Sequence, residues 1–439
     1  MDAITAGYAA AAFMIVLLVT GIPVGAAMGI AGIAGMWLSS GYPLVAGQLS
    51  TLPYAVASNY AYAVLPLFVL MGVLAEMAGI TEEVFRVADL WLRRVKGGLY
   101  QAVVVGSAIF AAINGSTIVN AVVFTRVALP EMLKHGYSRS LSLGCIASAG
   151  SFAAMIPPSI TMVIYAIICE QSVGKLLIAG VIPGILTAVI YMIGISILMR
   201  LRPGLAPKVG KPVPLAERLR AGQWLLSVIA LIIVVMGGLY AGLFPPSAAG
   251  AAGAFGAFVI LLVRRRRNLK GGVLLRGLID SASVSCVIFL VLIGGLIFSR
   301  MLVASGVIDS FVAEMTRVAG GPAGFIVLAA LLYLILGCFI DTTSMMVVTL
   351  PFLFPVVKHF EIDPIWFGIL VVKLIEISVI TPPVGMNLFA VMSAADKDTR
   401  FSDLVRGVMP FIAMEMVVLC ILVAFPQLSL WLPEKMLGR

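Results

Sequence analysis

Two short polar stretches interrupt a chain that is otherwise dominated by apolar side chains. The first, NGST, covers residues 114–117, and the second, IDTTS, covers residues 340–344. Their hydroxyl, amide and carboxylate oxygens are hard ligands that suit a cation such as Na⁺. Ser116 or Thr117 alone would more often be a hydroxyl that packs between helices. Asp341 differs, because an isolated carboxylate in an apolar segment is costly, so we expect it to bind the cation or to help shape its site.

Each polar stretch is followed by a pair of prolines inside an apolar segment. IPPS spans residues 156–159, and TPPVGMN spans residues 381–387. Proline lacks a backbone N–H and frees a carbonyl one turn earlier, whereas glycine lets the chain turn tightly. One proline pair alone would indicate only a kinked helix. Two pairs at matching distances instead predict two broken helices, whose freed carbonyls suit Na⁺ and whose half-helix amino termini suit an anionic substrate.

The elements that must position these groups are membrane-spanning helices. The 439-residue chain is 62% hydrophobic and 11% charged, whereas an average soluble domain has about 25% charged residues. Apolar runs of about 18 residues or more recur along the chain, as in transmembrane helices. The five cysteines and two histidines show no ligand spacing, and the net charge of +9 is typical of basic cytoplasmic loops. Neither a metal centre built from these residues nor nucleic-acid binding is therefore predicted.

The distribution of basic residues predicts how the chain is threaded through the membrane. The basic segments 199–220 and 264–276 should be cytoplasmic, and the absence of Lys or Arg before Arg86 places the amino terminus on the other side. Tracing the spans from these segments makes residues 99–133 a re-entrant hairpin that enters from the cytoplasm with NGST at its tip. Residues 323–357 form a second hairpin, which enters from the opposite side with IDTTS at its tip.

The two halves of the chain are predicted to be inverted repeats of one unit. A spacing of 225 residues separates Ser116 from Asp341 and also separates Pro158 from Pro383. Because the two hairpins enter from opposite sides, the repeats must be inverted in the membrane. Inverted repeats with broken helices are typical of secondary transporters, whose sites lie near the bilayer midplane at the repeat interface.

This interpretation divides the chain into five parts. The amphipathic runs 81–97 and 307–321 precede the two hairpins and are expected to be interfacial arm helices that link a mobile unit to a fixed one, with ordinary solvated helices as the alternative. The parts are scaffold helices at 1–59, a first repeat at 60–199 with its broken helix at 140–168, a cytoplasmic loop and scaffold helix pair at 200–275, a second repeat at 276–425 with its broken helix at 364–395, and a carboxy-terminal tail at 426–439.

Two charged residues within apolar segments have open roles. Arg126 lies in the first hairpin, where its long side chain is expected to extend to the cytoplasmic face and not to bind substrate. Glu376 precedes the second proline pair. It either supports the cation site or pairs with a neighbouring helix.

At these motifs the sequence resembles the large membrane subunit of tripartite ATP-independent periplasmic (TRAP) transporters, the DctM-like family. The matching stretches cover nearly the whole chain in the expected order. They are NGST with LPEMLKHGYSRS, AGSFAAMIPPSITMVIYAI, SVGKLLIAGVIPGIL, GCFIDTTSMMVVTLPFLFPVV and EISVITPPVGMNLFA. The resemblance implies an all-α polytopic protein of the bacterial inner membrane, with an inverted-repeat, ion-transporter-like elevator fold, two re-entrant helical hairpins and both termini in the periplasm.

The resemblance also implies a function and partners. The chain would import an organic carboxylate, driven by a Na⁺ gradient and without enzyme activity. A periplasmic substrate-binding protein would deliver the substrate, and a separate four-helix membrane subunit would brace the scaffold within the membrane lipid.

The family's site residues can be carried over position by position. The first Na⁺ site would use Asn114, Gly115, Ser116, Thr117, Ile156, Pro157, Pro158 and Ser159. The second Na⁺ site would use Asp341, Thr342, Thr343, Ser344, Thr381, Pro382, Pro383, Gly385 and Asn387. The substrate would lie between the two tips, near Ser116, Thr117, Ser159, Thr342, Thr343 and Asn387.

Three other functions are compatible with the residues alone. A stand-alone carboxylate/Na⁺ symporter of related fold would need no binding protein. The membrane subunit of a sodium-pumping decarboxylase would need a biotin-carrying partner, and this chain has no catalytic constellation of its own. A scaffold without transport would leave two matched polar hairpins at membrane depth without a purpose.

Overall fold

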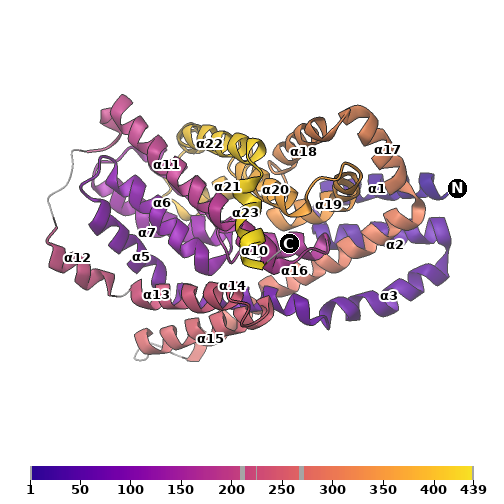
Figure 1. The fold of residues 1–439 in the computed structure, drawn as a ribbon, viewed down its shortest axis with the longest axis horizontal. Helices are drawn as coiled ribbons and strands as arrows, with labels where there is room; N and C mark the ends of the chain where they lie inside the picture. Colours follow the sequence, from indigo (N-terminus) through magenta and orange to yellow (C-terminus); the bar gives the residue numbers. More distant parts are fainter. Residues whose placement is uncertain (1, 208–212, 224, 266–270, 438–439) are drawn as a thin grey trace.

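The computed structural model of the protein describes four stretches of the chain, and these form helices joined by short connections (Figure 1). The described residues are 2–207, 213–223, 225–265 and 271–437. Parts of both basic segments predicted to be cytoplasmic therefore lie outside the described residues. Within them, five helices are long and apolar enough to cross a membrane, or up to seven if each of two bent pairs is one span. The apolar runs of the sequence thus form helices of transmembrane length.

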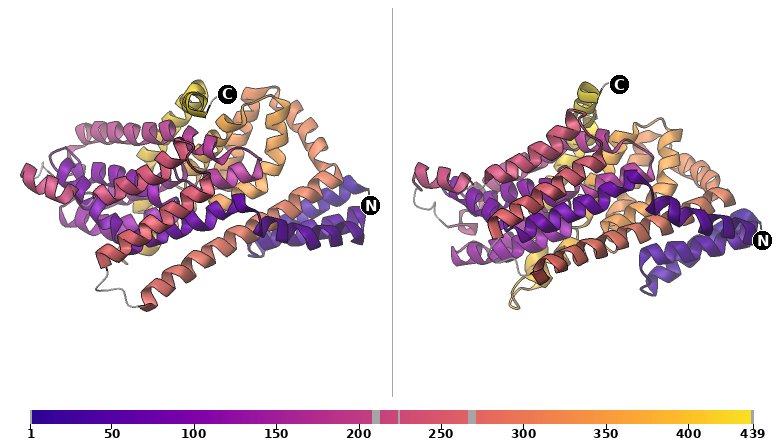
Figure 2. Two further views of the ribbon diagram at one scale, coloured as in Figure 1. Left: turned by 60° about the horizontal axis from the view of Figure 1, so that its bottom comes forward. Right: turned by 90° about the horizontal axis from the view of Figure 1, so that it is seen from below.

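The amino-terminal helices pack against one long helix from the middle of the chain. Figure 2 shows this helix, α16, extending along one side of the molecule. Its closest packing partner is α2, and α4 also lies against it. The helices of this group are α1 (Ala3–Val19), α2 (Val24–Ser40), α3 (Tyr42–Ala57), α4 (Val64–Met77) and α16 (Gly271–Ser305).

Glycines allow α2 and α16 to pack backbone against backbone. A Cβ atom on Gly294 would lie 1.9 Å from the carbonyl oxygen of Gly25. No real side chain fits at that distance, so the two helices can pack this closely only because both positions lack a side chain.

We expect Gly294→Ala to lower the free energy of unfolding by about 1–3 kcal/mol, as overpacking of a tight interface does. Gly272→Ala on the same helix is the matched control, because a Cβ there would meet nothing within 4 Å. Thermal melting of the detergent-solubilised variants measures the difference. Equal melting temperatures for the two variants would contradict the backbone contact.

Two series of helices on either side of α16 in the sequence follow the same order. Each has an amphipathic helix, a hairpin of two helices, a broken helix and a long final helix, and the first series has a further short helix before its final one. The first series is α5 (Ile80–Leu92), α6 (Gly98–Asn114), α7 (Thr117–Lys134), α8 (Arg139–Gly150), α9 (Ile160–Ile168), α10 (Val173–Ala179) and α11 (Val181–Leu201). The second series is α17 (Val307–Ala319), α18 (Pro322–Leu336), α19 (Thr342–His359), α20 (Pro364–Ser378), α21 (Met386–Ala394) and α22 (Phe401–Ala424).

The two hairpins approach the centre of the molecule from opposite ends. In Figure 1, α6 and α7 lie to the left of the centre, and α18 and α19 lie to the right. The amphipathic helix α17 meets α18 at a bend of 108°. The two hairpins thus lie on either side of the centre, and the side of the membrane from which each one enters stays a prediction.

The remaining helices include one in the predicted carboxy-terminal tail. Residues 40–59 contain two prolines and belong to the part predicted as scaffold helices, and most of them form α3. Pro43 lies in the first turn of that helix, where no backbone N–H is needed. The helix in the predicted tail is α23 (Gln427–Leu437), and it packs on α10. The others are α12 (Leu215–Gly222), α13 (Leu225–Ile232), a π-helical segment (Ile233–Gly237), α14 (Gly238–Tyr240) and α15 (Pro246–Arg265).

Candidate functional site

The first hairpin turns at a tip that is built by a glycine and a serine. Helix α6 ends at Asn114, and Gly115 adopts a left-handed conformation with φ of +66°. Ser116 is the N-cap of α7, and its Oγ accepts a hydrogen bond of 3.5 Å from the backbone N–H of Val119. The Asn114 side-chain amide donates to the Ser116 carbonyl at 3.4 Å. The polar residues of NGST thus end one helix and begin the next within two residues.

The second hairpin turns in an equivalent way. Asp341 is the N-cap of α19, and its Oδ2 accepts hydrogen bonds from the backbone N–H groups of Thr343, at 3.0 Å, and Ser344, at 3.1 Å. Ser116 and Asp341, which the repeat pairs with each other, therefore have the same role. The structure places Asp341 where it shapes the tip, and its role as a cation ligand stays a prediction.

The first broken helix meets the tip of the first hairpin. A short 3₁₀ turn (Ser151–Ala154) follows α8, and α9 begins only at Ile160. Ser159 caps α9 by accepting from the backbone N–H of Met162 at 3.2 Å, and it donates to the Ala154 carbonyl at 2.5 Å. A Cβ on Gly115 would lie 2.9 Å from the carbonyl oxygen of Pro158. The two predicted parts of the first cation site are therefore in contact.

The second broken helix likewise meets the tip of the second hairpin. Helix α20 ends at Ser378 and α21 begins at Met386, so residues 379–385 form the break. The Cys338 thiol at the second tip lies 3.6 Å from the carbonyl oxygen of Pro382. Both proline pairs contain a cis peptide bond between their two prolines. The hairpin and the break of each repeat thus form one unit.

Asn387 holds the second break against a helix of the first repeat. Its backbone N–H donates to Val379 O at 3.0 Å, across the break, and its side-chain amide donates to Ala147 O on α8 at 3.3 Å. Its Oδ1 atom is buried and has no hydrogen-bond partner among the described residues. A buried oxygen of this kind is available to a cation.

Both tips line one cavity of about 470 Å³. Helices α7, α9 and α19 all begin at this cavity, and the amino terminus of a helix carries partial positive charge that favours an anion. The opposite wall comes from α4 and α16 and is mostly apolar. The polar lining residues are Asn114, Ser116, Thr117, Thr161, Ser283, Asp341, Thr342 and Thr343, and the apolar wall includes Val69, Val73, Val284, Val287 and Ile288.

The structure separates the predicted substrate residues into two groups. Ser116, Thr117, Thr342 and Thr343 line the cavity, whereas Ser159 and Asn387 are fully buried and do not line it. Ser344 and the two breaks at 156–159 and 381–387 also lie away from its lining.

The sequence interpretation missed the residues that complete the cavity. Thr161 lies just after the first break, so the break itself could have indicated it. Ser283 and the valines of α4 and α16 carry no sequence signal, because they look like other residues of apolar spans.

The two charged residues with open roles both lie away from this cavity's lining. Arg126 is exposed, and the expectation that it does not bind substrate stays a prediction. Glu376 is fully buried and accepts a hydrogen bond from Lys373 on its own helix.

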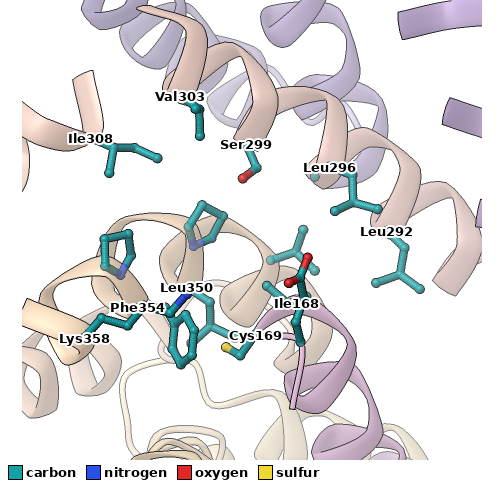
Figure 3. Close-up of a pocket in the computed structure, with 15 residues that line it drawn as sticks. Ile168, Cys169, Leu292, Leu296, Ser299, Val303, Ile308, Leu350, Phe354 and Lys358 are labelled. Carbon is teal, nitrogen blue, oxygen red and sulfur yellow. The ribbon is translucent and has the colours of Figure 1, made fainter. Parts of the chain in front are cut away.

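A second cavity, of about 290 Å³, lies between α16 and α19 (Figure 3). Figure 3 shows Leu296 and Ser299 of α16 facing Leu350 and Phe354 of α19 across it. None of the predicted site residues lines this cavity. It is therefore distinct from the cavity between the two tips.

Comparison with known proteins agrees with this architecture. The family model for the DctM component of tripartite ATP-independent periplasmic transporters matches residues 11–428. The chain is 30% identical over 388 residues to the C4-dicarboxylate TRAP transporter large permease protein DctM of Pseudomonas aeruginosa, covering 87% of this chain and 88% of that protein. It is 30% identical over 442 residues to the sialic acid TRAP transporter permease protein SiaT of Haemophilus influenzae, covering 98% of this chain and 68% of that protein.

A solved structure with low sequence identity has a similar fold. The crystal structure of the Alcanivorax borkumensis YdaH transporter aligns with a TM-score of 0.63 and 15% identity, covering 98% of this chain and 99% of that chain. Together with the helix order and the paired hairpins, this likeness confirms the predicted fold class, an all-α polytopic membrane protein with an inverted-repeat, ion-transporter-like elevator fold. The protein is a transport permease and not an enzyme, which excludes the decarboxylase alternative. The chain belongs to the DctM family, the large permease component of TRAP transporters.

Proposed function

We propose that this permease imports an organic carboxylate together with Na⁺ by an elevator mechanism. The observation that carries the proposal is the single cavity at which both hairpin tips and three helix amino termini converge. The amino termini favour the negative charge of a carboxylate, and the threonine and serine hydroxyls can donate hydrogen bonds to it. The apolar wall of α4 and α16 is suited to the carbon skeleton.

The two Na⁺ sites are proposed where each tip meets its broken helix. The oxygen atoms there come from hydroxyls, backbone carbonyls and amides, with the one carboxylate of Asp341 at the second tip. Among the residues that the structure describes, no three His, Cys, Asp or Glu side chains form a group suited to a metal ion. This oxygen-rich donor set fits an alkali cation better than a transition metal. Bound Na⁺ would hold each tip against its break and so complete the substrate cavity.

The position of the cavity supports the elevator movement. Its tips and the start of α9 belong to the hairpin and broken-helix units, whereas its opposite wall belongs to α4 and α16. In the proposed cycle, the hairpin and broken-helix units move as one body, and the helices packed along α16 remain fixed. The amphipathic helices α5 and α17 would be the arms between the two bodies.

The proposal includes two partners and a place in the cell. A periplasmic binding protein would deliver the substrate, and a separate four-helix membrane subunit would support the fixed helices. The protein would lie in the bacterial inner membrane with both termini in the periplasm and its basic connections in the cytoplasm. The relatives named for C4-dicarboxylates and for sialic acid support the carboxylate class but do not select one compound.

Reconstitution in proteoliposomes tests the proposal. We expect labelled carboxylate to accumulate only when Na⁺ is higher outside, and only with the binding protein and the small membrane subunit present. Replacing Na⁺ by choline is the control. Uptake by this chain alone would favour the stand-alone symporter, and uptake without a Na⁺ gradient would contradict the coupling.

A further inference from the structure

Three titratable side chains meet in the interior of the protein, away from the cavity lining. Lys373 and Glu376 lie on α20, and Glu415 lies on α22. All three are fully buried. Neither the cavity nor the proposed cation sites include any of them.

The hydrogen bonds of this cluster leave one oxygen without a partner. The Lys373 ammonium donates to Glu376 Oε2 at 2.5 Å, to Glu415 Oε2 at 2.7 Å and to Thr187 Oγ1 at 2.9 Å. An ammonium has three N–H donors, so its capacity is used up. Glu415 Oε1 accepts a further hydrogen bond of 2.7 Å from the Tyr191 hydroxyl. Glu376 Oε1 is buried without a hydrogen-bond partner in the described part of the chain.

The formal charges of the cluster do not balance. Two ionised carboxylates and one ammonium would leave a net charge of −1 in a fully buried place, which is costly. Glu415 receives a hydrogen bond at each of its two oxygens, so it is better suited than Glu376 to carry the negative charge. Glu376 has a donor at only one.

We propose that Glu376 carries a proton, so that the cluster is a buried, electrically neutral proton site. The proton sits on Oε1, the oxygen without a partner, and Oε2 accepts from Lys373. The cluster ties α11 of the first repeat to α20 and α22 of the second, and Glu376 lies less than one turn before the end of α20 at the second break. Loss of the proton would place a negative charge at this junction and weaken it.

The other titratable groups around α20 do not supply the missing charge. Those that interact with Glu376 are Lys373, Glu415 and, through Glu415, Tyr191 of α11. Tyr165 of α9 donates instead to Pro364 O at the far end of α20, and Tyr333 of α18 is bonded to Thr349. The charged residues of α10, α19 and α23 are partly or fully exposed, namely Lys175, Lys358, His359, Glu434 and Lys435.

The neutral acid gives a substitution at Glu376 a definite expected effect. Glu376→Gln keeps the neutral shape and the size of the protonated side chain. We therefore expect this variant to melt at least as high as wild type.

Glu415→Gln is the matched control on the same lysine. It removes the ionised partner of Lys373, and we expect the melting temperature to fall by several degrees. In infrared difference spectra of the full chain in lipid nanodiscs, Glu376→Gln should remove the C=O band of a protonated carboxylic acid, which shifts in D₂O. If Glu415→Gln does not fold, the infrared spectrum of Glu376→Gln decides alone.

Several outcomes would overturn the inference. The first is a Glu376→Gln protein that melts as low as Glu415→Gln. The second is an infrared spectrum in which Glu376→Gln loses a carboxylate band and not the acid band. The third is a melting temperature that Na⁺ raises in wild type but not in Glu376→Gln. The last result would identify a sodium ligand. None of these readouts requires transport, so the inference and the proposed function can fail separately.

Discussion

Replacing Asp341 by alanine is expected to abolish Na⁺-driven uptake while leaving the protein folded. The Asp341 carboxylate accepts from two backbone N–H groups at the start of α19 and lines the cavity between the tips. Loss of an N-cap costs about 0.5–2 kcal/mol, which lowers stability without unfolding a protein of this size. Loss of the carboxylate also removes the charge proposed for the second Na⁺ site. Uptake in proteoliposomes should therefore fall to the level of liposomes without protein.

Asp341→Asn separates the two roles of this side chain. Asparagine caps helices about as well as aspartate, so the tip keeps its shape while the negative charge is lost. If the carboxylate binds Na⁺, Asp341→Asn should melt like wild type and still fail to transport, or need a much higher Na⁺ concentration. Asp363→Ala controls for loss of the cap alone, because Asp363 caps α20 by accepting from two backbone N–H groups and lies away from the cavity lining. Wild-type uptake by Asp341→Asn would show that the residue only shapes the tip.

The paired tips could be predicted from sequence because their chemistry repeats at a fixed spacing. Ser116 and Asp341 share that spacing and both cap the second helix of a hairpin. The prolines and glycines that break α8–α9 and α20–α21 act through the backbone, so their effect is local and visible in the sequence. The same repeat made it possible to predict that each hairpin tip contacts the break of its own half.

Other parts of the site depend on contacts between distant helices and could not be predicted. Glu376 was recognised as a residue of open role, but Glu415, which shares Lys373 with it, lies on another helix with no pattern that connects the two. Ser159 and Asn387 were expected near substrate. Both are instead turned into the protein, where Ser159 caps α9 and Asn387 bonds to α8. Asn387 is turned by a bond to a distant helix, whereas Ser159 is turned by bonds within the first break.

Gly115→Ala is expected to reduce uptake far more than it reduces stability. Gly115 adopts a left-handed conformation, and a Cβ there would lie 2.9 Å from Pro158 O and 3.4 Å from the backbone nitrogen of Ile160. The added methyl group must push the first tip away from the first break, where we propose a Na⁺ site. Small displacements in a preorganised site have large effects, so we expect uptake to fall roughly tenfold or more.

Gly136→Ala provides the matched control for backbone strain. Gly136 has φ of +78°, close to the +66° of Gly115, but a Cβ at this position meets nothing within 4 Å. Both variants therefore share the cost of holding alanine in a left-handed conformation, about 1–2 kcal/mol. Only Gly115→Ala also disturbs the contact between tip and break. If both variants lost uptake equally, strain alone would account for the effect, and that contact would not be needed for transport.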